Sequence, residues 1–215
     1  MKRWRGCRGY FTILEISSIV LAGGKSSRFG HDKVFKTVGD QNLLDLVINR
    51  VAPLSRETIL VTASKNTLVQ SNKYPELKTV IDVYPGKGPL GGVYTGLLTS
   101  ESSFNLVVAS DMPFLNTELL HHMIQVSAGF DLVVPRIGGL VEPLHAIYAK
   151  SCLEPMAHLL RRNELSIHRL FPMVSTRYME ANEIERFDPE HLSFFNVNTR
   201  ADLSKAKEIA RGMER

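Results

Sequence analysis

The sequence has only two cysteines, Cys7 and Cys152, among its 215 residues. Two cysteines are too few for a disulfide framework, and the chain has no CxxC motif or Cys/His cluster of the kind that binds zinc. It also lacks a run of about 18 apolar residues, which a membrane span needs. These absences favour a soluble protein of the reducing cytoplasm, without disulfides, structural zinc or a membrane partner.

Acidic residues are absent from the first eleven positions, where four of the 26 lysines and arginines lie. The rest of the chain therefore has 22 basic and 22 acidic residues, although the net charge of the whole chain is +4. Because no dense basic stripe with interleaved aromatic residues follows residue 11, we expect no nucleic-acid partner. The basic start also lacks the apolar stretch and cleavage site of a signal peptide. We expect residues 1–14 to be a disordered extension, or to reflect a start codon assigned too far upstream.

The length and the 44% hydrophobic content suit one substantial domain, which we expect over residues 15–215. Strand-like segments lie at 16–21, 58–62, 79–82, 104–109, 132–135 and 144–148. Helix-like segments lie at 43–51, 117–126, 152–162 and 200–211, with a Gly/Pro-rich loop at 85–92 and a turn at 138–139. This alternation predicts a doubly wound α/β fold with a mostly parallel sheet.

Polar and glycine-rich segments follow three of the predicted strands. Segment 22–33 follows the first strand, Asp82 ends another, and Asp111 comes just after a third. In open parallel sheets, ligands bind beyond the carboxyl ends of the strands, where these loops converge. We therefore expect the site at this carboxyl edge of the sheet.

The first of these segments, Leu-Ala-Gly-Gly-Lys-Ser-Ser-Arg-Phe-Gly-His-Asp-Lys at 21–33, differs from two familiar phosphate-binding motifs. A Walker A motif needs glycine five residues before Gly24, where this chain has Ile19, and the glycine spacing does not fit G-x-G-x-x-G. Its glycines nevertheless permit close backbone approach, and Lys25, Arg28 and Lys33 can offset the charge of a triphosphate. The alternative is a solvated basic turn.

Segment 21–33 closely resembles the signature of the molybdenum cofactor guanylyltransferases, the bacterial MobA family. The resemblance continues through Gly-Pro-Leu-Gly-Gly at 88–92, Ser-Asp-Met-Pro-Phe-Leu at 110–115 and Asn-Val-Asn-Thr at 196–199. It covers about residues 16–210, and the order of the four motifs makes it specific at the level of the family. It implies a single-domain nucleotidyltransferase fold of Rossmann-like type.

The resemblance also implies the residues of a GTP site, with Asp111 binding Mg²⁺. The other nucleotide-binding residues that it implies are Leu21, Ala22 and Gly23 at the guanine end, together with Lys33 and Asp82. The sequence independently favours Asp111 as the metal ligand, because Mg²⁺ is held by one or two carboxylates together with substrate phosphates. For Asp82 and Asp111, the alternative is a loop-capping aspartate.

The implied reaction is attack by the terminal phosphate of molybdopterin on the α-phosphorus of GTP, which gives molybdopterin guanine dinucleotide and pyrophosphate. A phosphate nucleophile is already anionic, so no general base is needed, and Arg28, Lys33 and Asp111 with Mg²⁺ are expected to carry catalysis. The seven histidines show no metal-ligand spacing. We expect none to be essential, and Cys152 has no evident base partner.

The acceptor side is expected in the C-terminal half, where the family places acceptor recognition. Asn196 and Asn198 are candidates, but Asn198-Thr199 can equally be a helix N-cap, with Asp202 completing a capping box. For Arg161, Arg162 and Arg169, we favour a structural role. The protein partners implied by the resemblance are other cofactor-biosynthesis proteins and the molybdoenzymes that receive the product.

Two other classes of function fit part of the same pattern. One is a related transferase that uses CTP or another acceptor, such as a cytidylyltransferase or a sugar-phosphate nucleotidyltransferase, since these share the Ala-Gly-Gly start of the loop. The other is a catalytically silent GTP-binding module. The presence of both Lys33 and Asp111 argues against lost chemistry.

Overall fold

The computed structural model describes residues 15–22, 36–63, 74 and 76–213. Its strands are β1 (Ile16–Ala22), β2 (Thr37–Val38), β3 (Gln41–Asn42), β4 (Glu57–Thr62), β5 (Leu77–Ile81), β6 (Phe104–Ala109), β7 (Leu132–Ile137), β8 (Leu140–Val141), β9 (His145–Ala149) and β10 (Thr176–Glu180). Its α-helices are α1 (Leu43–Val51), α2 (Gly88–Thr99), α3 (Thr117–Gln125), α4 (Leu153–Arg161), α5 (Ala181–Ile184) and α6 (Arg200–Met213). Shorter 3-10 turns are η2 (Ala52–Leu54), η4 (Lys150–Cys152), η5 (Ile167–Met173) and η6 (Leu192–Phe194).

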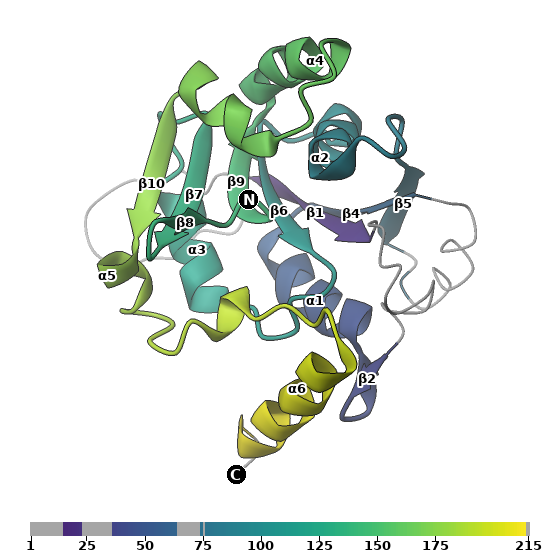
Figure 1. The fold of residues 1–215 in the computed structure, drawn as a ribbon, viewed down its shortest axis with the longest axis vertical. Helices are drawn as coiled ribbons and strands as arrows, with labels where there is room; N and C mark the ends of the chain where they lie inside the picture. The colour runs from purple at the N-terminus through teal and green to yellow at the C-terminus, as the bar shows by residue number, and fades with distance from the viewer. Residues whose placement is uncertain (1–14, 23–35, 64–73, 75, 214–215) are drawn as a thin grey trace.

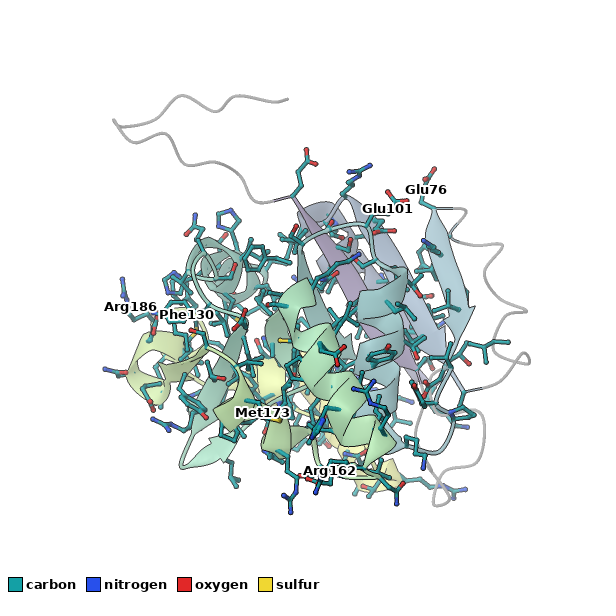
Figure 2. The ribbon with its side chains drawn as sticks, turned by 90° about the horizontal axis from the view of Figure 1, so that it is seen from above. Glu76, Glu101, Phe130, Arg162, Met173 and Arg186 are labelled. Carbon is teal, nitrogen blue, oxygen red and sulfur yellow. The ribbon has the colours of Figure 1, made fainter. Side chains whose placement is uncertain are left out.

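One large twisted sheet forms the centre of the molecule (Figure 1). Within the described residues its order is β10-β7-β9-β6-β1-β4-β5, and β8 pairs with β7. Strands β6, β1, β4 and β5 are parallel neighbours, whereas β9 runs antiparallel to β6 and β7. The carboxyl ends of β1, β4, β5 and β6 therefore meet at one edge. The opposite edge carries Glu76 and Glu101, which come before β5 and β6 (Figure 2).

Helices cover both faces of this sheet, because successive strand residues point to opposite sides. On β1, Val20 packs in a core cluster with α1 and α3, which we call the first face, and its neighbour Ile19 packs with α2 and α4 on the second face. A smaller cluster joins α6 to β2 and the start of α1. No helix in the described ranges combines the length and the apolar character needed to cross a membrane. The predicted doubly wound, mostly parallel α/β fold is confirmed.

Most predicted elements are present within one or two residues of their expected ends. The Asn42 side chain caps α1 by accepting a 2.8 Å hydrogen bond from the Asp45 amide, and Asn116 caps α3 in the same way. The predicted turn at Gly138 and Gly139 joins β7 to β8, and both glycines have positive φ. Local capping and turn chemistry therefore fixes these boundaries.

The expected loop at 85–92 is wrong over its second half, where α2 begins at Gly88. Gly88 takes a positive φ of 67°, and Pro89 lies in the first helical turn, where its missing N–H costs nothing. The glycines lower the intrinsic helix propensity. Tertiary packing outweighs that cost, since a Cβ at Gly91 would lie 2.9 Å from the Tyr84 carbonyl oxygen. Here glycine permits close packing within a helix.

Candidate functional site at the carboxyl edge

At the carboxyl edge of the sheet, backbone hydrogen bonds connect the ends of neighbouring strands. The Ser110 amide donates to the Leu21 carbonyl at 3.1 Å, and the Asp82 amide donates to the Thr62 carbonyl at 2.9 Å. Leu21 is 7% exposed and its side chain packs in the core, so its side chain is not free to contact a nucleotide. Ala22 is half-buried at the end of β1. The predicted site residues Gly23, Lys25, Arg28 and Lys33 lie outside the described residues.

Asp111 lies just beyond β6, and the residue is partly exposed, although its Oδ1 atom is buried. Its backbone carbonyl accepts a 2.9 Å hydrogen bond from the amide of Val197. Val197 is 1% exposed and packs in the cluster beneath α6. The segment 196–198, far away in sequence, is therefore anchored directly against the predicted metal ligand.

The two candidate asparagines flank this anchor. The Asn196 side chain donates to the Phe194 carbonyl at 3.1 Å, and the Asn198 amide donates to the Asp202 carboxylate at 2.9 Å. The Asp202 amide in turn bonds the Thr199 hydroxyl at 3.1 Å, which confirms the predicted capping box at the start of α6. The structural interpretation is thus correct, and the acceptor-binding role stays a prediction for two residues beside Asp111.

Asp82 has the loop-capping role that the sequence offered as the alternative to nucleotide binding. Its Oδ1 atom accepts from the Tyr84 amide at 2.9 Å and contacts the Thr95 hydroxyl at 2.8 Å. Thr95 is 1% exposed on α2, and its hydroxyl also accepts from the Val83 amide at 3.1 Å. Asp82 therefore ties the β5–α2 connection to α2, and its predicted contact with the nucleotide remains a prediction.

The sheet order separates the two predicted acidic residues. Asp111 follows β6 and Asp82 follows β5, so three strand intervals, or roughly 14 Å, lie between their strands. One Mg²⁺ ion cannot bridge carboxylates placed that far apart. Within the described part of the chain, no group of three His, Cys, Asp or Glu side chains could hold a metal. A single carboxylate such as Asp111 is compatible with Mg²⁺ binding, because substrate phosphates and water supply the remaining ligands at such sites.

The three arginines for which the sequence favours a structural role all form ion pairs with glutamates. Arg161 pairs with Glu154 at 3.0 Å, while Arg162 and Arg169 pair with Glu164 at 2.7 and 3.2 Å. Arg162 projects from the end of α4 (Figure 2). These pairings agree with the structural role favoured for the three arginines.

Cys152 is fully buried in η4, directly after β9, in the core cluster of the second face. Burial raises the pKa of its thiol to about 12, with a smaller contribution from the charge of Asp131. A thiol with so high a pKa is not a nucleophile near neutral pH. The expectation of no nucleophilic role for Cys152 is supported.

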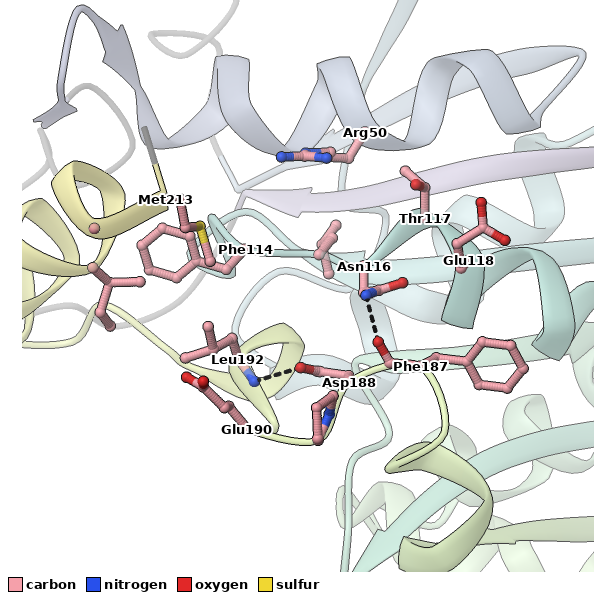
Figure 3. Close-up of a pocket in the computed structure, with 14 residues that line it drawn as sticks. Arg50, Phe114, Asn116, Thr117, Glu118, Phe187, Asp188, Glu190, Leu192 and Met213 are labelled. Atoms are coloured by element: carbon pink, nitrogen blue, oxygen red, sulfur yellow. Dashed lines mark hydrogen bonds between the residues drawn. The ribbon is translucent and has the colours of Figure 1, made fainter. Parts of the chain in front are cut away.

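A separate cavity of about 610 Å³ lies between the end of α1, segment 114–118, loop 187–192 and the end of α6 (Figure 3). Its charged lining residues are Arg50, Glu118, Asp188 and Glu190. The Asp188 carboxylate accepts hydrogen bonds from the amides of Leu192 and Ser193 at 3.0 and 2.8 Å. With more acidic than basic groups on its described walls, this cavity does not suit a triphosphate, and the carboxyl edge remains the candidate site.

Residues 18–175 match the model of the MobA-like NTP transferase domain. The chain belongs to this family. It is 32% identical over 200 residues to a protein of Peptoclostridium acidaminophilum named "Probable molybdenum cofactor guanylyltransferase", with 90% of this chain and 89% of the relative covered. The family membership inferred from the four motifs is confirmed.

Solved structures agree with this assignment. Molybdopterin-guanine dinucleotide biosynthesis protein A from Archaeoglobus fulgidus superposes with a TM-score of 0.80 and 28% identity, over 92% of this chain and 100% of that one. The 4-diphosphocytidyl-2C-methyl-D-erythritol synthase of Anaerococcus prevotii superposes with a TM-score of 0.70 at 15% identity, over 94% and 98% of the two chains. The second likeness shows the fold alone, so it gives no support to the alternative with CTP.

Proposed function

We propose that the protein transfers the GMP moiety of GTP to the terminal phosphate of molybdopterin, forming molybdopterin guanine dinucleotide and pyrophosphate. The family membership carries this proposal, together with relatives named for that reaction at about 30% identity over about 90% of the chain. The carboxyl edge provides a compatible place, since Asp111, the end of β1 and segment 196–198 lie side by side there.

Asp111 is the residue proposed to hold Mg²⁺. The ion would neutralise phosphate charge and fix the geometry of the reacting groups. Arg28 and Lys33 add positive charge where two anionic phosphates meet, with Arg28 able to bind phosphate oxygens bidentately. Leu21, Ala22 and Gly23 contact the guanine end through their backbone, and Asp82 orders the β5–α2 side of the nucleotide site. No side chain needs to remove a proton, because the acceptor phosphate is already ionised.

The acceptor approaches from the side of segment 196–198. Because the Val197 amide holds that segment against Asp111, a phosphate bound near Asn196 and Asn198 lies close to the α-phosphorus of GTP. The reaction is placed in the cytoplasm, and the product passes to molybdoenzymes that use the dinucleotide form of the cofactor.

A panel of nucleotides tests the assignment. With Mg²⁺ and metal-free molybdopterin, GTP should give pyrophosphate and the dinucleotide with the highest kcat/KM among GTP, CTP, ATP and UTP. A preference for CTP would instead assign the chain to the cytidylyltransferase alternative. A chain that binds GTP without releasing pyrophosphate would be the silent binding module.

A further inference from the structure

Glu142 is a half-buried carboxylate between the β7–β8 hairpin and β9. Its side chain makes no hydrogen bond or ion pair within the described residues, and burial raises its pKa above the ordinary value. A carboxylate that loses water without gaining donors lowers the stability of the fold. Because Glu142 lies at the candidate edge, its free oxygens can accept hydrogen bonds from a bound molecule.

The direction of the Glu142 side chain follows from the strand pattern. Its amide donates to the Pro135 carbonyl at 3.1 Å, so the β7–β8 ladder continues to this residue. The preceding Val141 packs on the second face, with α2 and α4. Because adjacent strand residues point to opposite sides, Glu142 points to the first face. Pro135 pairs with Met179, which packs on that same face.

The segment that bears Asn196 packs on the same connection. His145 starts β9 and is fully buried, and its ring lies 4.6 Å from the ring of Phe194. His145 is paired with Val108 of β6, which lies in the cluster of the first face. Glu142 and the segment leading to Asn196 therefore lie on the same side of the sheet. The ring contact between His145 and Phe194 joins the two segments.

The connection also lies close to the metal ligand. The Ala109 amide donates a hydrogen bond to the Leu144 carbonyl at 3.1 Å. Leu144 comes two residues after Glu142, and Asp111 comes two residues after Ala109. Two residues of extended chain on each side and one strand interval place the Cα atoms of Glu142 and Asp111 at most about 19 Å apart. One elongated ligand with its phosphate at Asp111 can extend toward Glu142.

We propose that Glu142 recognises the pterin end of the acceptor, by accepting hydrogen bonds from its 2-amino group and the adjacent ring N–H. This inference rests on the proposed function. The phosphate and dithiolene groups of molybdopterin are anionic and would be repelled by a carboxylate, whereas its N–H donors lie on the pterin. Two parallel donors match the two oxygens of a carboxylate, as in bidentate pairs with arginine.

Glu142→Gln tests this directly. The KM for metal-free molybdopterin should rise about 10- to 100-fold, while the KM for GTP stays unchanged, because one charge-assisted recognition contact is lost. The melting temperature should not fall. The raised pKa means that the ionised carboxylate opposes folding at neutral pH, and glutamine removes that charge. A purely structural role predicts the reverse, with a lower melting temperature and no selective change in acceptor KM.

Glu164→Gln is the matched control, since Glu164 is engaged by Arg162 and Arg169 and should not affect acceptor binding. Glu142→Asp keeps the charge and should retain part of the acceptor affinity if the glutamine variant does not fold.

A binding measurement separates this inference from the proposed function. Pterin, titrated by its fluorescence without turnover, should bind the wild type more tightly than lumazine, which has an oxo group in place of the 2-amino group. Glu142→Gln should abolish that preference. If the wild type shows the preference but forms no dinucleotide, the proposed function fails and the pterin site stands. A variant that keeps both the preference and the acceptor KM overturns the role of Glu142.

Discussion

Asp111→Asn should lower kcat for pyrophosphate release by about 10²–10³-fold while leaving the fold intact. Asparagine has the same shape but carries no charge, so it weakens Mg²⁺ binding at the point where phosphate charge must be offset. The residue is partly exposed, and it binds Val197 through its backbone carbonyl, which the substitution retains. Steady-state kinetics across a Mg²⁺ titration, with circular dichroism for the fold, measures both parts.

Asp82→Asn provides the control at the same edge. Because roughly 14 Å separates the two strands concerned, Asp82 should not share the ion, and its variant should keep the wild-type dependence on Mg²⁺ concentration. Its effects should fall on stability or on the KM for GTP, through the contact with Thr95. Equal shifts in Mg²⁺ dependence for the two variants would contradict the assignment of the metal to Asp111.

Gly96→Ala should destabilise the protein by about 2 kcal/mol, even though alanine is the better helix former. A Cβ at Gly96 would lie 2.4 Å from Cγ2 and 2.9 Å from Cδ1 of Ile19. Ile19 is fully buried in the central strand, and its branched side chain has few alternative rotamers. In a protein of this size, the melting temperature should fall by about 4–8 °C.

Gly92, one turn earlier on α2, is the matched control. A Cβ there would lie 3.4 Å from the Leu21 side chain, an ordinary contact, so Gly92→Ala should be neutral or stabilise by up to about 1 kcal/mol. Combining Gly96→Ala with Ile19→Ala should cost less than the sum of the single changes, because the second removes the clashing atoms. Equal stability of the two glycine variants would show that α2 does not pack against β1 as described.

The strands at the centre of the sheet could be predicted because their sequences are continuous apolar runs, as in β1 and β6. Strand β10 was missed, since Thr176–Glu180 has polar residues at most positions and only Met179 is fully buried. The start of helix α2 was not predicted, because its glycines suggest a loop. They are needed in the helix because Tyr84 and Ile19 pack closely against it. Local propensity carries no information about such partners.

The candidate site shows the same division. The place of Asp111 after an apolar strand predicts a metal ligand, and that role stays a prediction. The capping box of Thr199 and Asp202 was predicted from its spacing and is confirmed. The anchoring of Val197 on Asp111 depends on a hydrogen bond between residues 86 positions apart, and no local pattern predicts it. Glu142 was missed because a single carboxylate beside a proline has no distinctive motif. A charged residue within an otherwise apolar strand segment is the signal that could have found it.

The most direct test of guanylyl transfer is the fate of two radioactive labels in GTP. With molybdopterin and Mg²⁺, the α-phosphorus label should appear in the dinucleotide product, and the γ-phosphorus label should appear in pyrophosphate alone. A γ label on the acceptor, or its release as orthophosphate, would contradict nucleotidyl transfer.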